Sequence, residues 1–272
     1  MTRPKQIAVV SGKGGTGKTS LVAAFAELAA LPLVAVDADV DASNLGLLLH
    51  GAEQESFPFV GGMKAEISWE RCAGCGACAK VCRFGAIRET EGHLFAVNHY
   101  SCEGCKACQF RCPASAIQMK DSMAGYWSVR DVVSGVLVHA RLGIAQDNSG
   151  KLVTRIRTEA ERIAAEEAHE LILIDGPPGI GCPVHAAIGG ADLVVAVTEP
   201  TPSGIHDVAR MLAVARHFDI KSVLVLNKAG LTATYGRELQ DLSKKFAAPV
   251  LARIPYDPTA PATLAEGRSL LH

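Results

Sequence analysis

The 272-residue sequence has no apolar stretch that reaches the roughly 20 residues needed to cross a bilayer. Its most apolar region, residues 21–36, is interrupted by Glu27 and Pro32. The first residues also lack the apolar segment and the small-residue cleavage site of a signal peptide. From these absences we expect no membrane span and no export, and hence a cytoplasmic protein.

The sequence also lacks an excess of either charge, because 27 basic side chains balance 28 acidic ones. The resulting net charge of −1 supplies no long-range field that would attract nucleic acid or an anionic membrane, so we expect neither partner. The hydrophobic content of 49% is enough for a sizeable core, and we expect the chain to be globular throughout.

Cysteine, by contrast, is abundant, with nine residues in the chain. Eight of the nine fall between Cys72 and Cys112, and the ninth, Cys182, stands apart. Disulfide frameworks belong to small exported domains that lack a core of their own. The clustering therefore favours metal binding over disulfides.

The clustered cysteines form two C-x2-C-x2-C-x3-C runs, which repeat at an offset of 30 residues. This spacing is typical of bacterial ferredoxins with two [4Fe–4S] clusters, in which the fourth cysteine of each run ligates the other cluster. Zinc is the alternative, although zinc sites usually pair two C-x2-C hairpins or add histidine. The predicted ligands are Cys72, Cys75, Cys78 and Cys112 for one cluster, and Cys102, Cys105, Cys108 and Cys82 for the second.

A glycine-rich segment near the N-terminus matches G-x-x-x-x-G-K-[ST] directly after a predicted strand and before a predicted helix. Its glycines let backbone N–H groups point at phosphates, and the helix adds the positive end of its dipole. We expect Lys18 to reach the β- and γ-phosphates and the Thr19 hydroxyl to bind Mg²⁺. The predicted nucleotide-binding residues of this loop are Gly12, Lys13, Gly14, Gly15, Thr16, Gly17, Lys18 and Thr19.

Outside the cysteine-rich segment, apolar strands alternate with amphipathic helices, including predicted helices at residues 154–167 and 208–218. This alternation predicts an α/β fold with a mostly parallel sheet that is covered on both faces. We expect a discontinuous P-loop ATPase domain of residues 1–64 and 121–272. A small α+β domain of the two-cluster ferredoxin type would be inserted at residues 65–120.

The second lysine of the loop, Lys13, makes it similar to the deviant P-loop of the MinD/ParA/Mrp/nitrogenase-iron-protein superfamily. The resemblance covers about residues 5–64 and 121–268. In that superfamily the corresponding lysine reaches across a nucleotide-sandwich dimer to the partner's phosphates. The resemblance therefore implies dimerisation on ATP, either with a second copy or with a related ATPase, and a catalytic role for Lys13 beside Lys18.

The resemblance extends to the remaining site residues. Residues 37–39 resemble the switch I strand end, where Asp39 is the candidate for orienting the attacking water. Residues 175–179 resemble switch II, and Asp175 would hold Mg²⁺ through its water shell. Asn227 and Pro255 resemble the adenine-binding elements of the family.

Isolated cysteine and histidine residues leave two interpretations open. Cys182, just beyond the switch II segment, is either a small buried residue or part of a metal site between two protomers. His139, His185 and His206 are further candidate ligands, although isolated histidines are more often surface residues or hydrogen-bonded core residues.

Four functions are compatible with these motifs. The first hypothesis is a slow, partner-stimulated Mg²⁺-dependent ATPase that couples nucleotide turnover to electron transfer; it implies ATP, Mg²⁺ and two [4Fe–4S] clusters, and a redox or cluster-accepting protein partner. The second is a metallocluster assembly or insertion factor similar to the Mrp carriers. The third is a positioning ATPase similar to MinD and ParA, although the final TLAEGRSLLH lacks the basic amphipathic tail of MinD. The fourth is a synthetase similar to the cobyrinic acid diamide enzymes.

Overall fold

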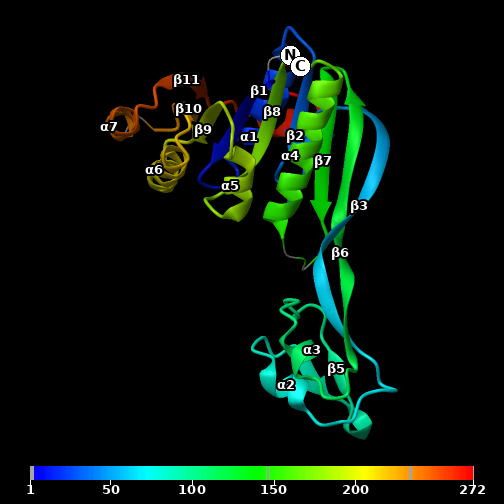
Figure 1. The fold of residues 1–272 in the computed structure, drawn as a ribbon. Helices are drawn as coiled ribbons and strands as arrows, with labels where there is room; N and C mark the ends of the chain where they lie inside the picture. The colour runs from blue at the N-terminus through cyan, green and yellow to red at the C-terminus, as the bar shows by residue number, and fades with distance from the viewer. Residues whose placement is uncertain (1–2, 145, 147, 233–234, 272) are drawn as a thin grey trace. The chain divides into compact units, whose positions relative to one another are not determined.

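A computed structural model describes residues 3–144, 146, 148–232 and 235–271 of the chain. The chain forms two compact units (Figure 1). The sheet unit contains residues 1–57, 127–141 and 149–272, and the cysteine unit contains residues 58–126 and 142–148. The predicted insertion, residues 65–120, lies inside the cysteine unit, which extends further along the chain on both sides.

The described residues of the sheet unit are organised on a sheet with the strand order β11-β10-β9-β1-β8-β2-β7-β6-β3. Every neighbouring pair from β11 to β7 is parallel, which confirms the predicted mostly parallel α/β fold. The strands are β1 (Lys5–Ser11), β2 (Leu33–Asp37), β3 (Gly51–Ile67), β6 (Ile117–Val132), β7 (Gly135–Leu142), β8 (Leu171–Pro178), β9 (Leu193–Thr198), β10 (Ser222–Ala229) and β11 (Val250–Pro255).

The end of the sheet formed by β7, β6 and β3 is antiparallel. Two residues join β6 to β7, and a connection this short requires antiparallel strands. The backbone of Gly51 lies against Asp131, while the Ser68 N–H donates to the Ala116 carbonyl oxygen at 2.8 Å. These contacts make β3 antiparallel to β6, and both strands continue from the sheet unit into the cysteine unit.

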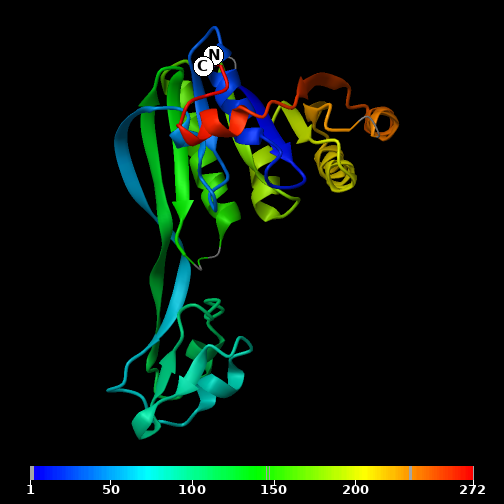
Figure 2. The same ribbon diagram turned by 180° about the vertical axis from the view of Figure 1, so that it is seen from behind.

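Helices cover both faces of this sheet. Figure 1 shows α4 and α5 on one face, and the reverse view in Figure 2 shows α1 and the red α8 on the other. Helices α4 and α6 begin earlier than predicted. The early start of α6 is explained by the Thr201 hydroxyl, which caps the helix by accepting a hydrogen bond from the Gly204 N–H at 3.0 Å. The helices of the sheet unit are α1 (Lys18–Leu28), α4 (Ser149–Glu166), α5 (Cys182–Ile188), α6 (Pro202–His217), α7 (Gly236–Phe246) and α8 (Ala260–Ala265), with a 3₁₀ turn, η1, at Leu45–Leu47.

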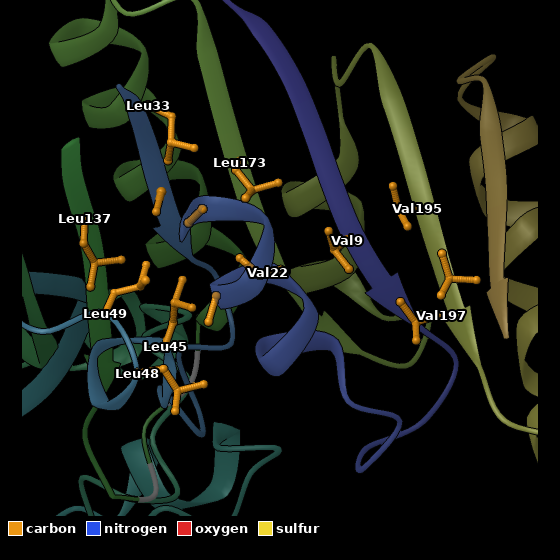
Figure 3. Close-up of a cluster of buried hydrophobic side chains, with 14 residues drawn as sticks. Val9, Val22, Leu33, Leu45, Leu48, Leu49, Leu137, Leu173, Val195 and Val197 are labelled. Atoms are coloured by element: carbon orange, nitrogen blue, oxygen red, sulfur yellow. The ribbon is translucent and has the colours of Figure 1, made fainter. Parts of the chain in front are cut away.

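An apolar core between α1 and the sheet supports the strand ends (Figure 3). Val22 of α1 packs among side chains of β1, β2, β8 and β9, and the leucines of the segment after β2 close the core on one side. Burial of this apolar area fixes the start of α1 above the carboxyl ends of the parallel strands. The labelled core residues are Val9, Val22, Leu33, Leu45, Leu48, Leu49, Leu137, Leu173, Val195 and Val197.

The cysteine unit repeats one small motif twice. Each copy places a short helix directly after its first cysteines, α2 (Ala77–Val81) in the first copy and α3 (Ala107–Arg111) in the second. The two helices pack against each other. An antiparallel pair, β4 (Ile87–Glu89) and β5 (Phe95–Val97), flanks a short 3₁₀ turn, η2 (Glu91–His93), between the copies. The internal repeat predicted from the sequence is therefore also a repeat of structure.

No helix formed by the described residues combines the length and apolarity that crossing a membrane would require.

Candidate functional site

The glycine-rich loop, Gly12–Thr19, connects β1 to α1 at the carboxyl edge of the sheet. Gly17 has φ +89°, and a Cβ there would lie 2.3 Å from the Asn227 Nδ2 atom, so only glycine fits. The same Nδ2 donates to the Thr16 carbonyl oxygen at 2.8 Å. Asn227, at the carboxyl end of β10, thus ties a distant strand to the loop.

A cavity opens beside this loop within the sheet unit. Asn227 and Pro255, the two residues predicted to contact adenine, both line it, and so do Gly15 and Gly17 of the loop. The cavity combines apolar walls with a few polar groups, as ligand sites usually do. Its lining is Gly15, Gly17, Ser20, Leu21, Ala24, Val197, Asn227, Lys228, Ile254, Pro255, Tyr256, Asp257, Thr259, Ala260, Pro261, Thr263, Leu264 and Leu270.

Two buried carboxylates lie side by side at the ends of β2 and β8. Asp37 and Asp175 are paired in the strand register, and their exposed fractions are 0% and 1%. Asp37 accepts hydrogen bonds from the Ser43 hydroxyl at 2.8 Å and from the backbone N–H groups of Leu45 at 2.9 Å and Asp39 at 3.2 Å. Sequence reasoning missed this role, in which Asp37 anchors the backbone that follows β2.

Asp175 differs from Asp37 because neither of its carboxylate oxygens has a hydrogen-bond partner among the described residues. Burial raises the pKa of Asp175, and the neighbouring Asp37 raises it further, while Thr19 and Lys18 act in the opposite direction. A buried, unpaired carboxylate is costly unless a cation compensates it. With Thr19 on the same side, this oxygen pair fits a Mg²⁺ ion and its water shell.

Asp39 lies at the edge of the same site, half-buried after the end of β2. Burial raises the pKa of its carboxyl, and the Lys18 ammonium lowers it. Lys18 itself is only 6% exposed at the first position of α1. The structure therefore brings Lys18, Asp39 and Asp175 into one electrostatically connected group.

Lys13 is held inside its own chain by a buried carboxylate that the sequence interpretation did not include. Its Nζ atom lies 2.5 Å from Glu199 Oε1 and 3.0 Å from Ser203 Oγ. The other oxygen of Glu199 accepts from Lys228 Nζ at 2.9 Å, and Lys228 also donates to the Gly15 carbonyl at 2.9 Å. Burial opposes ionisation of Glu199, but the two lysines hold the pKa of its carboxyl below the usual range.

The eight clustered cysteines surround two separate hollows in the cysteine unit. The first hollow is lined by Cys72, Cys75, Cys78 and Cys112, and the second hollow by Cys82, Cys102, Cys105 and Cys108. Each hollow therefore takes three cysteines from one run and the fourth from the other. This is the crossed grouping that the ferredoxin spacing predicts.

The backbone around the hollows suits thiolate ligands. The Cys112 Sγ atom accepts a backbone hydrogen bond from Ala116 at 3.3 Å, and the Cys102 Sγ atom accepts one from Ala65 at 3.5 Å. Within the described residues, no three His, Cys, Asp or Glu side chains converge closely enough to hold a single metal ion. The thiolates of a cubane cluster bind four different irons and spread around it, so the donor set fits a cluster better than a lone zinc ion.

Cys182 and the three candidate histidines have separate surroundings. Cys182 begins α5 with an exposed side chain, which contradicts the interpretation of a small buried residue. His185 stands edge-on to the Phe218 ring at 5.4 Å, and His206 pairs with Asp207 at 3.1 Å. His139 is half-buried on β7 beside Asp37 in the strand register. None of the four belongs to a described group that could hold a metal ion.

A protein-family model described as the CobQ/CobB/MinD/ParA nucleotide binding domain matches residues 7–270 of the chain. The match includes parts of all three segments of the sheet unit and the cysteine-unit residues between them.

Individual proteins are also similar to this chain. An uncharacterised protein of Methanocaldococcus jannaschii, MJ0578, is 32% identical over 228 residues, which are 83% of this chain and 79% of the relative. An uncharacterised ferredoxin of the same organism, MJ0722, is 39% identical over 54 residues, 19% of this chain and 70% of its own length. Among solved structures, MinD of Pyrococcus horikoshii complexed with Mg-ADP aligns with a TM-score of 0.54 at 20% identity, over 98% of this chain and 87% of that one.

Proposed function

The chain belongs to the CobQ/CobB/MinD/ParA nucleotide-binding family, and from this membership we propose that it is an ATPase coupling nucleotide binding and hydrolysis to electron transfer through two [4Fe–4S] clusters. The observation that carries the electron-transfer part is the crossed lining of the two hollows, because four cysteines from both runs surround each of them. The family supplies the ATPase part. The cysteine unit supplies the part that distinguishes this chain from an ordinary member of the family.

In the sheet unit, the loop and the two carboxylates divide the work on the nucleotide. Lys18 and the backbone N–H groups of the loop bind the phosphates, and Thr19 and Asp175 hold Mg²⁺. Asp39 orients the water that attacks the γ-phosphate. Asn227 and Pro255 position the base in the cavity beside the loop.

Lys13 acts across a dimer in this proposal, formed with a second copy or with a related ATPase. In the structure the Lys13 ammonium is neutralised by Glu199, so it must leave this carboxylate to reach a partner's phosphates. That exchange links dimer formation to the nucleotide. It also predicts that a single chain turns over slowly and that a protein partner stimulates it.

In the cysteine unit, the eight thiolates would hold two [4Fe–4S] clusters, which supply one-electron transfer when bound. Burial raises the pKa of the Cys78 and Cys108 thiols, so both keep their protons until a metal replaces them. Cys75 and Cys105 are exposed, one at each hollow, so electrons can pass to a redox partner at the surface.

The proposal is tested on protein purified without oxygen. We expect about eight iron atoms per chain and two EPR-active reduction steps whose potentials differ without nucleotide, with ADP and with a non-hydrolysable ATP analogue. Reduction potentials that do not change with the nucleotide would contradict the proposed coupling. Protein that binds no iron would contradict the proposed clusters.

The crossed ligand sets have a matched test. Cys112→Ser should disturb the cluster of the first hollow, which Cys112 lines. Cys108 belongs to the same cysteine run but lines the second hollow, so the second cluster should be retained. Cys182→Ser, which changes a cysteine of the sheet unit, should leave both EPR signals unchanged. Loss of the second cluster in Cys112→Ser would reject the crossed assignment.

A second candidate function is a cluster assembly or insertion factor. The exposure of Cys75 and Cys105 favours it, because an acceptor could attack each cluster at an accessible ligand. Transfer of iron and sulfide to an apo-ferredoxin, dependent on ATP, would support this function over electron transfer. A positioning ATPase is the third candidate, and the likeness to MinD structures supports it through the fold alone.

A further inference from the structure

The two hollows of the cysteine unit differ in charge, although the repeat makes them similar in shape. The second hollow includes Glu103 and Lys106 in its lining, whereas the first hollow contains no charged side chain besides its cysteines. At the offset of 30 residues, the corresponding positions of the first copy are Ala73 and Gly76. The two copies of the repeat thus differ by two charged residues, both of which belong to the second hollow.

Lys106 occupies a backbone conformation that is unfavourable for a side chain. Its φ is +65°, close to the φ of +69° at Gly76, the matching residue of the first copy. Both residues precede a short helix and make the turn that aims the cysteines inward. Glycine adopts this conformation without strain and lysine does not, so the second copy carries a lysine where glycine would suit the turn better.

A second ammonium group lies close to the same cysteines. The Lys64 Nζ atom donates to the carbonyl oxygen of Cys102 at 2.5 Å. Two lysines, Lys64 and Lys106, and one glutamate, Glu103, thus belong to the residues around the second hollow.

We propose that Lys106 raises the reduction potential of the cluster held by Cys82, Cys102, Cys105 and Cys108 above that of the other cluster, so that an electron entering the unit settles there. The inference rests on the cluster binding proposed above. A cluster that gains one electron becomes more negative by one charge, and a nearby ammonium stabilises the reduced form more than the oxidised form. The electron comes from an external one-electron donor, and no bond is made or broken.

The test compares two substitutions in the second copy, each of which introduces the glycine that the first copy has at the equivalent position. Lys106→Gly installs the residue that the first copy already has, so the turn is retained and only the ammonium is lost. Ser115→Gly is the control, because Ser115 also has a positive φ, +48°, where the first copy has Gly85. It relieves backbone strain without changing any charge.

Both variants and the wild type are titrated with dithionite and followed by EPR without nucleotide. We expect two resolved potentials in the wild type, a smaller gap in Lys106→Gly because the higher potential falls, and an unchanged gap in Ser115→Gly. Lys106→Gln keeps the strain and removes the charge, so its gap should match that of Lys106→Gly. The effect should shrink at high ionic strength, because Lys106 is exposed and salt screens its charge.

A gap unchanged in iron-loaded Lys106→Gly would overturn the inference, and so would an equal shift in Ser115→Gly, which would assign the effect to the backbone. Glu103→Gln should raise the higher potential, and a fall there would contradict the same charge argument. Wild-type protein without iron would overturn the proposed function together with this inference. Unchanged potentials in iron-loaded variants would overturn the inference alone.

Discussion

In the sheet unit the nucleotide site rests on an apolar core cluster of fourteen buried residues, whereas the corresponding cluster of the cysteine unit has eight, three of them cysteines. Cys78, Cys102 and Cys108 are thus core residues and proposed ligands at once. A core this small stabilises little structure without additional links, for which small domains use disulfides or metals. From this comparison we expect the sheet unit to fold before it binds its ligand, and the cysteine unit to depend on the proposed clusters for its stability.

The two units also differ in how their buried polar groups are satisfied. The sheet unit satisfies Asp37 with three hydrogen-bond donors and Glu199 with two lysines, and it leaves Asp175 for a cation. The cysteine unit instead surrounds two hollows with thiols. In the proposed function, the sheet unit is preorganised around an exchangeable nucleotide, and the cysteine unit would be organised by clusters that stay bound.

Removal of iron should break this comparison most visibly. Chelation under reducing conditions is expected to abolish hydrogen-exchange protection in α2, α3, β4 and β5, while ATP still binds to the sheet unit. Cys108→Ser should lose protection in the same elements, and Cys182→Ser should not. A cysteine unit that stays protected after iron removal would show that its small apolar core is sufficient.

Lys13→Ala should affect the nucleotide site of the sheet unit and leave the cysteine unit unchanged. We expect ATP turnover to fall by about 10²–10³-fold, as for loss of one donor to a transition-state charge, with both clusters retained. Lys151→Ala, an exposed lysine on α4, is the control. The measurements are steady-state phosphate release and iron content. Unchanged turnover would remove the model in which Lys13 acts across a dimer.

The sequence predicted those features that depend on neighbouring residues. The P-loop and the cysteine runs are local patterns, and the crossed grouping of cysteines follows from their spacing. Residues 51–64 contain Pro58, Gly61 and Gly62, which hide strand periodicity. β3 forms there because β6 pairs with it across a long sequence separation.

The parts of the site that escaped prediction depend on the order of strands. Glu199 meets Lys13 because β9 lies beside β1, although 186 residues separate them in the sequence. Asp37 and Asp39 look equivalent in the sequence, and only the course of the switch I segment directs three donors to Asp37. Such pairings follow from tertiary packing, which no local pattern encodes.

Asp175→Asn tests the difference between Asp175, whose oxygens have no hydrogen-bond partner among the described residues, and Asp37, which accepts three hydrogen bonds. We expect it to raise the free energy of unfolding of the metal-free protein by about 1–3 kcal/mol, because it removes a buried carboxyl group whose ionisation is opposed by burial and whose oxygens have no hydrogen-bond partner among the described residues. Asp37→Asn is the matched control and should be destabilising, since an amide NH₂ cannot accept the bonds made there. Denaturant titration, with and without Mg-ATP, measures both. Mg-ATP should stabilise the wild type and not Asp175→Asn, and equal destabilisation by the two substitutions would contradict this account.

Glu199 should give the smallest effect, one that depends on pH. Lys13 and Lys228 hold the pKa of Glu199 below its usual range, so the folded state binds the proton less tightly than the unfolded state. The stabilisation is therefore present at neutral pH and lost as the pH falls through the lowered pKa. It amounts to about 1 kcal/mol, because both lysine side chains keep nearly a third of their surface in water, 29% and 31%.

Glu199→Gln keeps the shape of this group and removes its charge. The difference in unfolding free energy between wild type and variant should be largest at neutral pH and should shrink on acidification, as measured by denaturant titration. Glu170→Gln, an exposed glutamate of the same unit, controls for the change in net charge. If the difference grew as the pH fell, Lys13 would not be held by a charged Glu199. The release of Lys13 on dimerisation would then need another trigger.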